Sequence, residues 1–252
     1  MPQIKISYII ITWNGIDHIR NLFRSLQNQI SRQDVEIIVV DNGSNDGTTD
    51  FLRTSYPSAR LITLNNNKGV AYARNRGLEK ALGQYLFILD NDIIANDEAL
   101  TGMEKYMDTN INVGLCGCKL YDAEGNLQES CKPYPGISQK IYNLFHRGKF
   151  RFHYKDMPAD QPFEPEYIIG ACQMIRREAF EQTGLLDENI FYGPEDCDYC
   201  LRIRKAGWKV IYLPQYSLIH HCQRKTNIHP FSPLARKHIR GLMYLYMKYK
   251  RI

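Results

Sequence analysis

The sequence predicts an α/β fold, in which helices cover both faces of a mostly parallel β-sheet. Through the first two thirds of the chain, β-branched apolar runs alternate with segments whose apolar residues recur at helical spacing, and this alternation is typical of βαβ units. Three of the strand-like runs end in polar residues, as expected where parallel strands meet at a ligand-binding edge. With 252 residues, of which 44% are hydrophobic and 23% charged, the chain can bury a sizeable core.

The predicted elements follow one another in regular order. Five apolar, β-branched runs predict strands at residues 4–12, 35–41, 59–64, 85–90 and 113–119. Helical spacing of apolar residues predicts helices that begin near Ile16 and Val70, and a shorter helix at residues 48–56 follows a turn. Regular structure returns at residues 167–176, followed by helices at 178–183 and 195–206 and a strand at 209–213.

Two segments depart from this pattern. Residues 122–165 show no sustained period, which is unusual for so long a loop, so we interpret them as an insertion or lid on a domain spanning residues 1–222. Residues 223–252 carry eight basic residues and no acid, which leaves 24 basic against 27 acidic residues in the rest of the chain. In this tail Ile239, Leu242, Met243 and Tyr246 recur at helical spacing. They predict a helix that either packs on its own domain or lies on an anionic membrane.

Composition narrows the location of the protein and the kinds of site it carries. No apolar run approaches the roughly 20 residues that span a bilayer, and the N-terminus lacks a signal-peptide pattern, so we expect a cytoplasmic protein. The seven cysteines are odd in number and scattered, which favours reduced thiols. Cys197 and Cys200 have zinc-type spacing without a second pair, so we do not expect structural zinc. No nucleic-acid partner is expected.

Polar residues at the strand ends form the first candidate site. Asp41 ends the second strand and opens a turn that runs to Thr48, where its carboxylate could accept hydrogen bonds from a base or ribose. Asp90 and Asp92 follow the fourth strand on the same side, close enough to repel one another unless a hard cation or sugar hydroxyls lie between them. The alternative is a polar turn with a helix cap at Asp97.

Two later features could also carry chemistry. Glu195, Asp196 and Asp198 stand in the first turn of a predicted helix. Acidic residues there either match the helix dipole or mount a catalytic carboxylate. His220 and His221 follow an apolar run, where a histidine is either a packed residue or a metal ligand.

Five short motifs in a fixed order resemble the family 2 inverting glycosyltransferases. In chain order they are residues 9–14, 39–48, 67–69 together with 73–77, 89–92, and 193–198. The resemblance spans roughly residues 4–221 and is closest to the bacterial rhamnosyltransferases and galactofuranosyltransferases of cell-surface polysaccharide synthesis. It implies the GT-A fold, a Rossmann-like form of the predicted sheet, with residues 122–165 on the acceptor side.

The resemblance also implies roles for individual residues. Donor and nucleotide binding falls to Thr12, Asn14, Asp41, Ser44, Asn67, Gly69, Arg74, Asp90 and Asn91. Asp92 would bind a divalent metal, Mn²⁺ or Mg²⁺, together with His220, whose neighbour His221 is its competitor. Asp196 matches the general base and Glu195 its acidic neighbour, while Arg74 and the metal would stabilise the departing nucleoside diphosphate.

The implied activity is inverting transfer of a sugar from a UDP- or dTDP-linked donor to a hydroxyl of a carbohydrate or lipid-linked glycan. The basic tail could then bring the protein to the inner face of the cytoplasmic membrane. A dinucleotide-binding oxidoreductase is disfavoured, because no Gly-x-Gly-x-x-Gly turn follows the first strand. A sugar nucleotidyltransferase would need a Gly-rich, basic first loop that the sequence lacks. A non-catalytic module that binds a nucleotide sugar or a glycan is the remaining alternative, and it should tolerate loss of Asp196.

Overall fold

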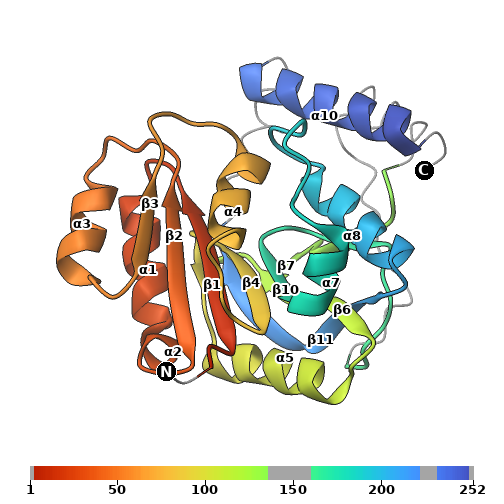
Figure 1. Ribbon diagram of the computed structural model, residues 1–252, viewed down its shortest axis with the longest axis horizontal. Helices are drawn as coiled ribbons and strands as arrows, with labels where there is room; N and C mark the ends of the chain where they lie inside the picture. The colour runs from red at the N-terminus through yellow and green to blue at the C-terminus, as the bar shows by residue number, and fades with distance from the viewer. Residues whose placement is uncertain (1–2, 136–159, 222–231, 250–252) are drawn as a thin grey trace.

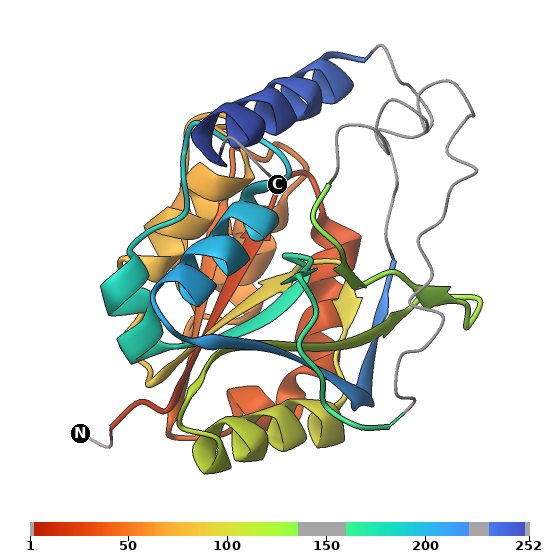
Figure 2. The same cartoon turned by 90° about the vertical axis from the view of Figure 1, so that its right-hand side faces the viewer.

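The structure of the chain, a computed structural model, describes residues 3–135, 160–221 and 232–249. Its centre is a nine-stranded sheet with helices on both faces (Figure 1). The last helix lies at one end of the molecule, on top of α8 in the view of Figure 2. The α/β fold predicted from the sequence is confirmed.

The first half of the sheet is parallel. Strands β3 (Arg60–Thr63), β2 (Val35–Asp41), β1 (Ile6–Thr12) and β4 (Tyr85–Asp90) lie side by side in this order. The register pairs Thr12 with Asp41 and Ile11 with Asp90, so the polar strand ends meet at one edge. The helices between these strands are α1 (Ile16–Ser25), α2 (Gln27–Ile30), α3 (Thr48–Ser55) and α4 (Val70–Leu78).

The second half of the sheet mixes strand directions. β10 (Cys172–Arg176) runs antiparallel between β4 and β6 (Val113–Tyr121), while β11 (Lys209–His220) runs parallel to β6. β5 (Ile93–Ile94) pairs antiparallel with the end of β11, which brings His220 beside the residues that follow β4. The expected parallel arrangement therefore describes the first half of the sheet better than the second.

Two elements differ from the sequence-based expectation. Helix α5 (Asp97–Thr109) was not predicted, and its cap is Asn96 rather than Asp97, because the Asn96 side chain accepts a hydrogen bond from the Ala99 amide (3.1 Å). Strand β11 does not end at Leu213 but continues to His220 through a register irregularity between Leu213 and Ser217. Pro214 lies within this irregularity, and it interrupts the apolar pattern that marks the strand in the sequence.

Part of the presumed lid is regular. Strand β7 (Leu127–Gln128) pairs with β6, and β8 (Cys131–Lys132) pairs with β9 (Tyr167–Ile168). Residues 136–159 of the presumed lid, and residues 222–231 and 250–252 of the basic tail, lie outside the described part of the chain.

Two apolar layers enclose the sheet. One contains Tyr8 and Ile10 of β1 with apolar residues of α1 and α5, and the other contains Ile9 with residues of α4, α7 (Arg177–Thr183) and α8 (Glu195–Lys205). This split follows the two-residue alternation of a strand buried on both faces. Because each fully buried side chain of this kind stabilises the fold by about 1.5–3 kcal/mol, the strand ends are rigidly mounted. The six described cysteines are buried and free of disulfide bonds.

Helix α10 (Pro233–Tyr249) packs only one of its apolar faces. Leu242 and Leu245 are buried, whereas Ile239, Met243 and Met247 are 48%, 58% and 69% exposed. The helix predicted for the basic tail is thus present, and it both packs on the domain and presents apolar side chains to solvent. Within the described ranges, no helix has the length and apolarity needed to cross a membrane.

Candidate functional site

The ends of β1 and β2 are tied together by Asn14 and Ser44. The Asn14 amide donates to Ser44 Oγ (2.8 Å), and the Asn45 amide donates to Asn14 Oδ1 (2.9 Å). Asn14 has a φ of 48°, a left-handed conformation that asparagine tolerates better than most residues. The two loops therefore form one surface at the carboxyl edge of the sheet.

Asp41 offers an unused acceptor at this edge. Its side chain is 2% exposed, and Oδ2 accepts from the Ser44 amide (3.0 Å). Oδ1 is buried and has no hydrogen-bond partner among the described residues. An unsatisfied buried carboxylate oxygen is costly, so this atom suits a ligand N–H or O–H. Nearby, Asn91 donates to Thr12 Oγ1 (3.0 Å) and joins the ends of β1 and β4.

Asn67 and Gly69 shape the start of α4. Asn67 Oδ1 accepts from the Gly69 amide (3.0 Å) and from the Asn42 side chain (3.2 Å). Gly69 has a φ of 95°, and a Cβ there would lie 2.6 Å from the Phe191 carbonyl oxygen. Only glycine fits this close approach. The loop before α8 is therefore held against the carboxyl ends of β1, β2 and β4, which we call the donor edge.

Three side chains form a possible metal site. Asp90, Asp92 and His220 each offer a ligand atom, and these atoms all lie within 4.8 Å of one another. His220 Nε2 is 3.3 Å from Asp92 Oδ1, and the three side chains are 7–28% exposed. His221 instead donates its backbone amide to the Asp92 carbonyl (2.9 Å). The structure thus brings the side chain of His220 to the two aspartates, whereas His221 reaches Asp92 through its backbone.

The charges within this cluster are unequally stabilised. Burial raises the pKa of Asp90, with the Asp92 carboxylate adding to the effect and Arg74 opposing it. Burial also acts on Asp92, but the hydrogen bond and charge of His220 outweigh it and lower the pKa of Asp92. The two carboxylates suit Mn²⁺ or Mg²⁺, which favour oxygen ligands, and the imidazole would add one nitrogen ligand. The residues present therefore fit a divalent cation.

Arg74 connects the donor edge to α8. Its guanidinium donates to Asp90 Oδ1 (2.7 Å), Glu195 Oε1 (3.1 Å) and the Gly170 carbonyl (2.8 Å). The residue is 3% exposed. The Arg74 charge therefore neutralises two carboxylates of the protein, contacts that the expected role at the diphosphate did not include.

Glu195 and Asp196 differ sharply although they are neighbours. Glu195 is 6% exposed, its Oε2 has no partner among the described residues, and burial together with the Asp196 charge raises its pKa to about 7. Asp196 is half-buried, and its two oxygens accept from the amides of Gly170 (3.1 Å) and Cys197 (2.7 Å). Asp196 is thus oriented by backbone amides while remaining accessible.

Sequence reasoning missed two residues of the site. Gly170, between β9 and β10, contacts both Arg74 and Asp196, and a Cβ there would lie 2.3 Å from Arg74 Nη1. Gln128 on β7 contacts His220. The only sequence signal for Gln128 is the turn at Asp122 and Gly125, which predicts a hairpin returning along β6.

Comparisons with known proteins show which sequences and folds the chain resembles. The model of a family described as "Glycosyl transferase family 2" matches residues 7–184. An N-acetylglucosaminyl-diphospho-decaprenol L-rhamnosyltransferase of Mycobacterium tuberculosis is 28% identical, over 94% of this chain and 82% of the relative. The dTDP-rhamnosyl transferase RfbF of Shigella flexneri is 27% identical, over 90% of this chain and 75% of the relative.

A solved structure supports the fold. The mannosyltransferase PcManGT from Pyrobaculum calidifontis, in complex with GDP-Man and Mn²⁺, matches with a TM-score of 0.63 and 19% identity. The match covers 88% of this chain and 58% of that one. At this identity the likeness concerns the fold alone, and it confirms the GT-A architecture.

Proposed function

Because the chain belongs to glycosyl transferase family 2, we propose that it transfers a sugar, with inversion, from a nucleoside diphosphate sugar to a hydroxyl group of a glycan. The observation that carries this proposal is the cluster of Asp90, Asp92 and His220 at the same edge as the unused Asp41 oxygen. A cation ligand set and a free acceptor for a base or ribose are what a nucleotide diphosphate requires.

Different residues of the chain would bind different parts of the donor. Asp41, with Thr12, Asn14 and Ser44 supporting the loops, would hold the base and ribose. Asn67, Gly69 and Asn91 would complete the donor pocket. A divalent ion on Asp90, Asp92 and His220 would supply neutralisation of the diphosphate. Arg74 would keep Asp90 and Glu195 in place rather than contact the phosphate itself.

Asp196 is the proposed base. Its carboxylate would take the proton of the acceptor hydroxyl while the hydroxyl oxygen bonds to the anomeric carbon. The bond from that carbon to the diphosphate oxygen breaks at the same time, and its electron pair leaves with the nucleoside diphosphate. One displacement on the opposite face inverts the anomeric configuration. Glu195, which is buried and paired with Arg74, would help to hold the start of α8 and therefore Asp196 in position.

The names of two relatives support a choice of candidate donor and acceptor. Both are named for rhamnosyl transfer, one with a dTDP-linked donor and one with a diphospho-decaprenol acceptor. We therefore place dTDP-rhamnose first among candidate donors, UDP-sugars second, and a lipid-linked glycan of polysaccharide synthesis first among acceptors.

The basic tail fits the same acceptor class. Ile239, Met243 and Met247 lie on an exposed face of α10, beside the exposed Arg236 and Arg240. Apolar side chains flanked by basic ones match the surface of an anionic membrane. Under this proposal residues 1–222 form the transferase domain, and residues 223–252 bring it to lipid-linked acceptor at the inner face of the cytoplasmic membrane.

A donor screen tests the proposal. Purified protein is incubated with Mn²⁺ and a panel of nucleotide sugars, and the released nucleoside diphosphate is measured by chromatography. We expect release from one donor class, above the rate of an Asp196→Asn variant. Tight binding of a nucleotide sugar without any release or transfer, with and without glycan acceptors, would favour the non-catalytic binding module.

A further inference from the structure

One side chain from the presumed lid contacts the only histidine of the cation cluster. Gln128 on β7 donates from Nε2 to the carbonyl oxygen of His220 (2.7 Å), and its Oε1 lies 2.8 Å from His220 Nδ1. Both residues are buried, although 92 positions separate them in the sequence. They meet because β7 and β11 both pair with the end of β6.

The two contacts together determine the position of a proton. A backbone carbonyl oxygen can only accept, so the Gln128 atom that faces it is the NH₂ group. The carbonyl oxygen Oε1 must then face His220 Nδ1, and an acceptor there calls for a proton on Nδ1. In a neutral imidazole this leaves the lone pair on Nε2. Nε2 is the atom that faces Asp92, at 3.3 Å from Oδ1.

We propose that Gln128 is a positioning residue that holds His220 with its Nδ1 protonated, so that the Nε2 lone pair is directed at the divalent cation beside Asp90 and Asp92. This inference rests on the cation site of the proposed function. A hydrogen bond from the second ring nitrogen fixes both the tautomer and the orientation of a ligand histidine. Loss of such a partner typically weakens metal affinity by about 10- to 100-fold.

Gln128 could instead serve only to attach β7 to β11. The pair of variants Gln128→Leu and Gln128→Glu separates the two roles. Leucine removes both contacts. Glutamate keeps an acceptor for Nδ1 but places a second carboxylate oxygen against the His220 carbonyl oxygen and adds a negative charge, so it is also expected to lower stability. A positioning role predicts weaker cation binding in Gln128→Leu and recovery in Gln128→Glu. A purely structural role predicts that both variants lose stability and neither selectively loses the cation.

The chain provides a matched control. Gln173 on β10 is also buried, and its Nε2 donates to the backbone carbonyl of Ile168 (2.8 Å). Gln173→Leu therefore removes a comparable buried amide without touching the cation cluster. We expect it to lower the free energy of unfolding as Gln128→Leu does, but to leave cation affinity at the wild-type value.

The test combines two readouts. Free Mn²⁺ is followed by electron paramagnetic resonance during titration of each protein, alone and with dTDP or UDP. The expected result is weakening by about 10- to 100-fold in Gln128→Leu only. In parallel, long-range ¹H–¹⁵N correlation spectra of the protein loaded with diamagnetic Mg²⁺ and a nucleoside diphosphate, with His220→Gln for assignment, should show His220 protonated on Nδ1 and not on Nε2.

The outcomes are distinguishable. Unchanged Mn²⁺ affinity in Gln128→Leu, or a proton on His220 Nε2 in the Mg²⁺-loaded wild type, would overturn this inference while leaving the proposed transferase intact. Absence of Mn²⁺ binding by the wild type, with and without nucleotide, would instead overturn the cation site on which the proposed function depends.

Discussion

The donor edge and the start of α8 both present carboxylates, but the fold holds them in different ways. At the donor edge, Asp41 and Asp90 end neighbouring strands of one sheet, so the pairing of the strands brings them together. At α8, the turn that precedes Glu195 is held by distant segments. A Cβ on Gly241 of α10 would lie 2.8 Å from the Gly193 carbonyl oxygen, which shows how closely this helix packs on the turn.

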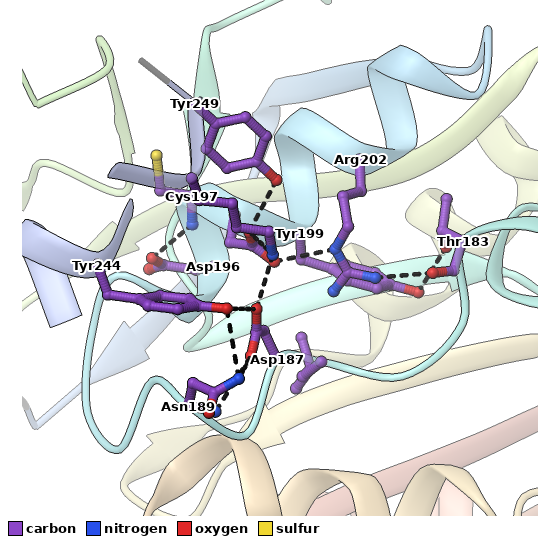
Figure 3. A network of polar contacts seen from close by, with 12 residues as sticks. Thr183, Asp187, Asn189, Asp196, Cys197, Tyr199, Arg202, Tyr244 and Tyr249 are labelled. Atoms are coloured by element: carbon purple, nitrogen blue, oxygen red, sulfur yellow. Dashed lines mark hydrogen bonds and ion pairs between the residues drawn. The ribbon is translucent and has the colours of Figure 1, made fainter. Parts of the chain in front are cut away.

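The same contrast appears within α8 itself. Asp198 is fully buried and accepts from Arg202 Nε (2.9 Å), Lys248 Nζ (2.7 Å) and the Tyr249 hydroxyl (2.8 Å). Figure 3 shows Arg202 and Tyr249 of this network together with Asp196 and Cys197. Asp196, two residues earlier, is half-buried and is held by backbone amides. A substrate cannot reach the buried Asp198 carboxylate, which is enclosed by its partners, whereas the half-buried Asp196 carboxylate is accessible. This difference supports the proposal that Asp198 anchors α8 while Asp196 acts on the acceptor.

Asp196→Asn should produce the largest effect. The amide keeps the size of the side chain but cannot accept the acceptor's proton, so turnover should fall by about 10²- to 10⁴-fold. Donor affinity should stay near the wild-type value, because donor binding depends on the donor edge and not on the start of α8. Steady-state kinetics and donor titration of the same preparation measure both. Transfer at close to the wild-type rate, or joint loss of activity and donor affinity, would contradict Asp196 as the base and leave Glu195 as the candidate.

Arg74→Gln should have the second largest effect, a loss of stability. Removal of the guanidinium leaves Asp90 and Glu195 without their shared cation, and breaking a buried ion pair in this way costs about 3–5 kcal/mol. Urea unfolding measures the loss. Arg76→Gln is the control, because Arg76 pairs with Glu79 and Glu188 at side chains that are 29–38% exposed. Equal effects from the two variants would show that Arg74 does not link the two regions.

Lys248→Met should weaken the contact between α10 and α8. Lys248 pairs with both Asp187 and Asp198 at 2.7 Å, and its loss should cost about 1–3 kcal/mol, since Asp198 keeps Arg202 and Tyr249. Hydrogen exchange should then increase in α10 and the first turn of α8 but not at the ends of β1 and β2. An equal increase at the donor edge would contradict the separation of the two regions.

The pH dependence of stability should report on Glu195. Burial and the Asp196 charge raise its pKa from 4.5 to about 7, so between these pH values the folded protein binds a proton that the unfolded chain has released. Stability therefore falls as the pH rises through this window. Glu195→Gln should flatten the curve between pH 5 and 7.5 in urea unfolding, and it should reduce activity less than Asp196→Asn. An unchanged slope would mean that Glu195 is ionised throughout.

The smallest effect is expected on the exposed face of α10. Met243→Ser should change stability by less than about 0.5 kcal/mol, because the side chain is 58% exposed. It should nevertheless reduce co-sedimentation with anionic lipid vesicles at low salt. Leu82→Ser is the matched control, since Leu82 is 64% exposed on another part of the surface. Vesicle binding that is absent in the wild type, or insensitive to Met243→Ser, would leave α10 with a packing role alone.

The two regions also differ in how far the sequence predicts them. Strands β2 and β4 have the predicted limits. Because the first half of the sheet is parallel, the motifs that follow its strands lie next to one another at the same edge. Helix α5, the continuation of β11 past Pro214, and the contact between Gln128 and His220 were not predicted. The last two depend on pairing between segments far apart in the chain, which neither residue spacing nor local propensity records. Helix α5 does have a local signal after the Asn96 cap, the helical spacing of Leu100, Met103 and Met107.

The central claim is that a nucleoside diphosphate binds through a divalent cation on Asp90, Asp92 and His220. Calorimetric titration with dTDP and UDP, in Mn²⁺ and again in chelator, tests it most directly. The account predicts binding that is measurable with Mn²⁺ and lost or greatly weakened with chelator, because the carboxylates then face the diphosphate unscreened. It also predicts that Asp92→Ala removes the dependence on Mn²⁺. Equal affinity with and without the cation would contradict it.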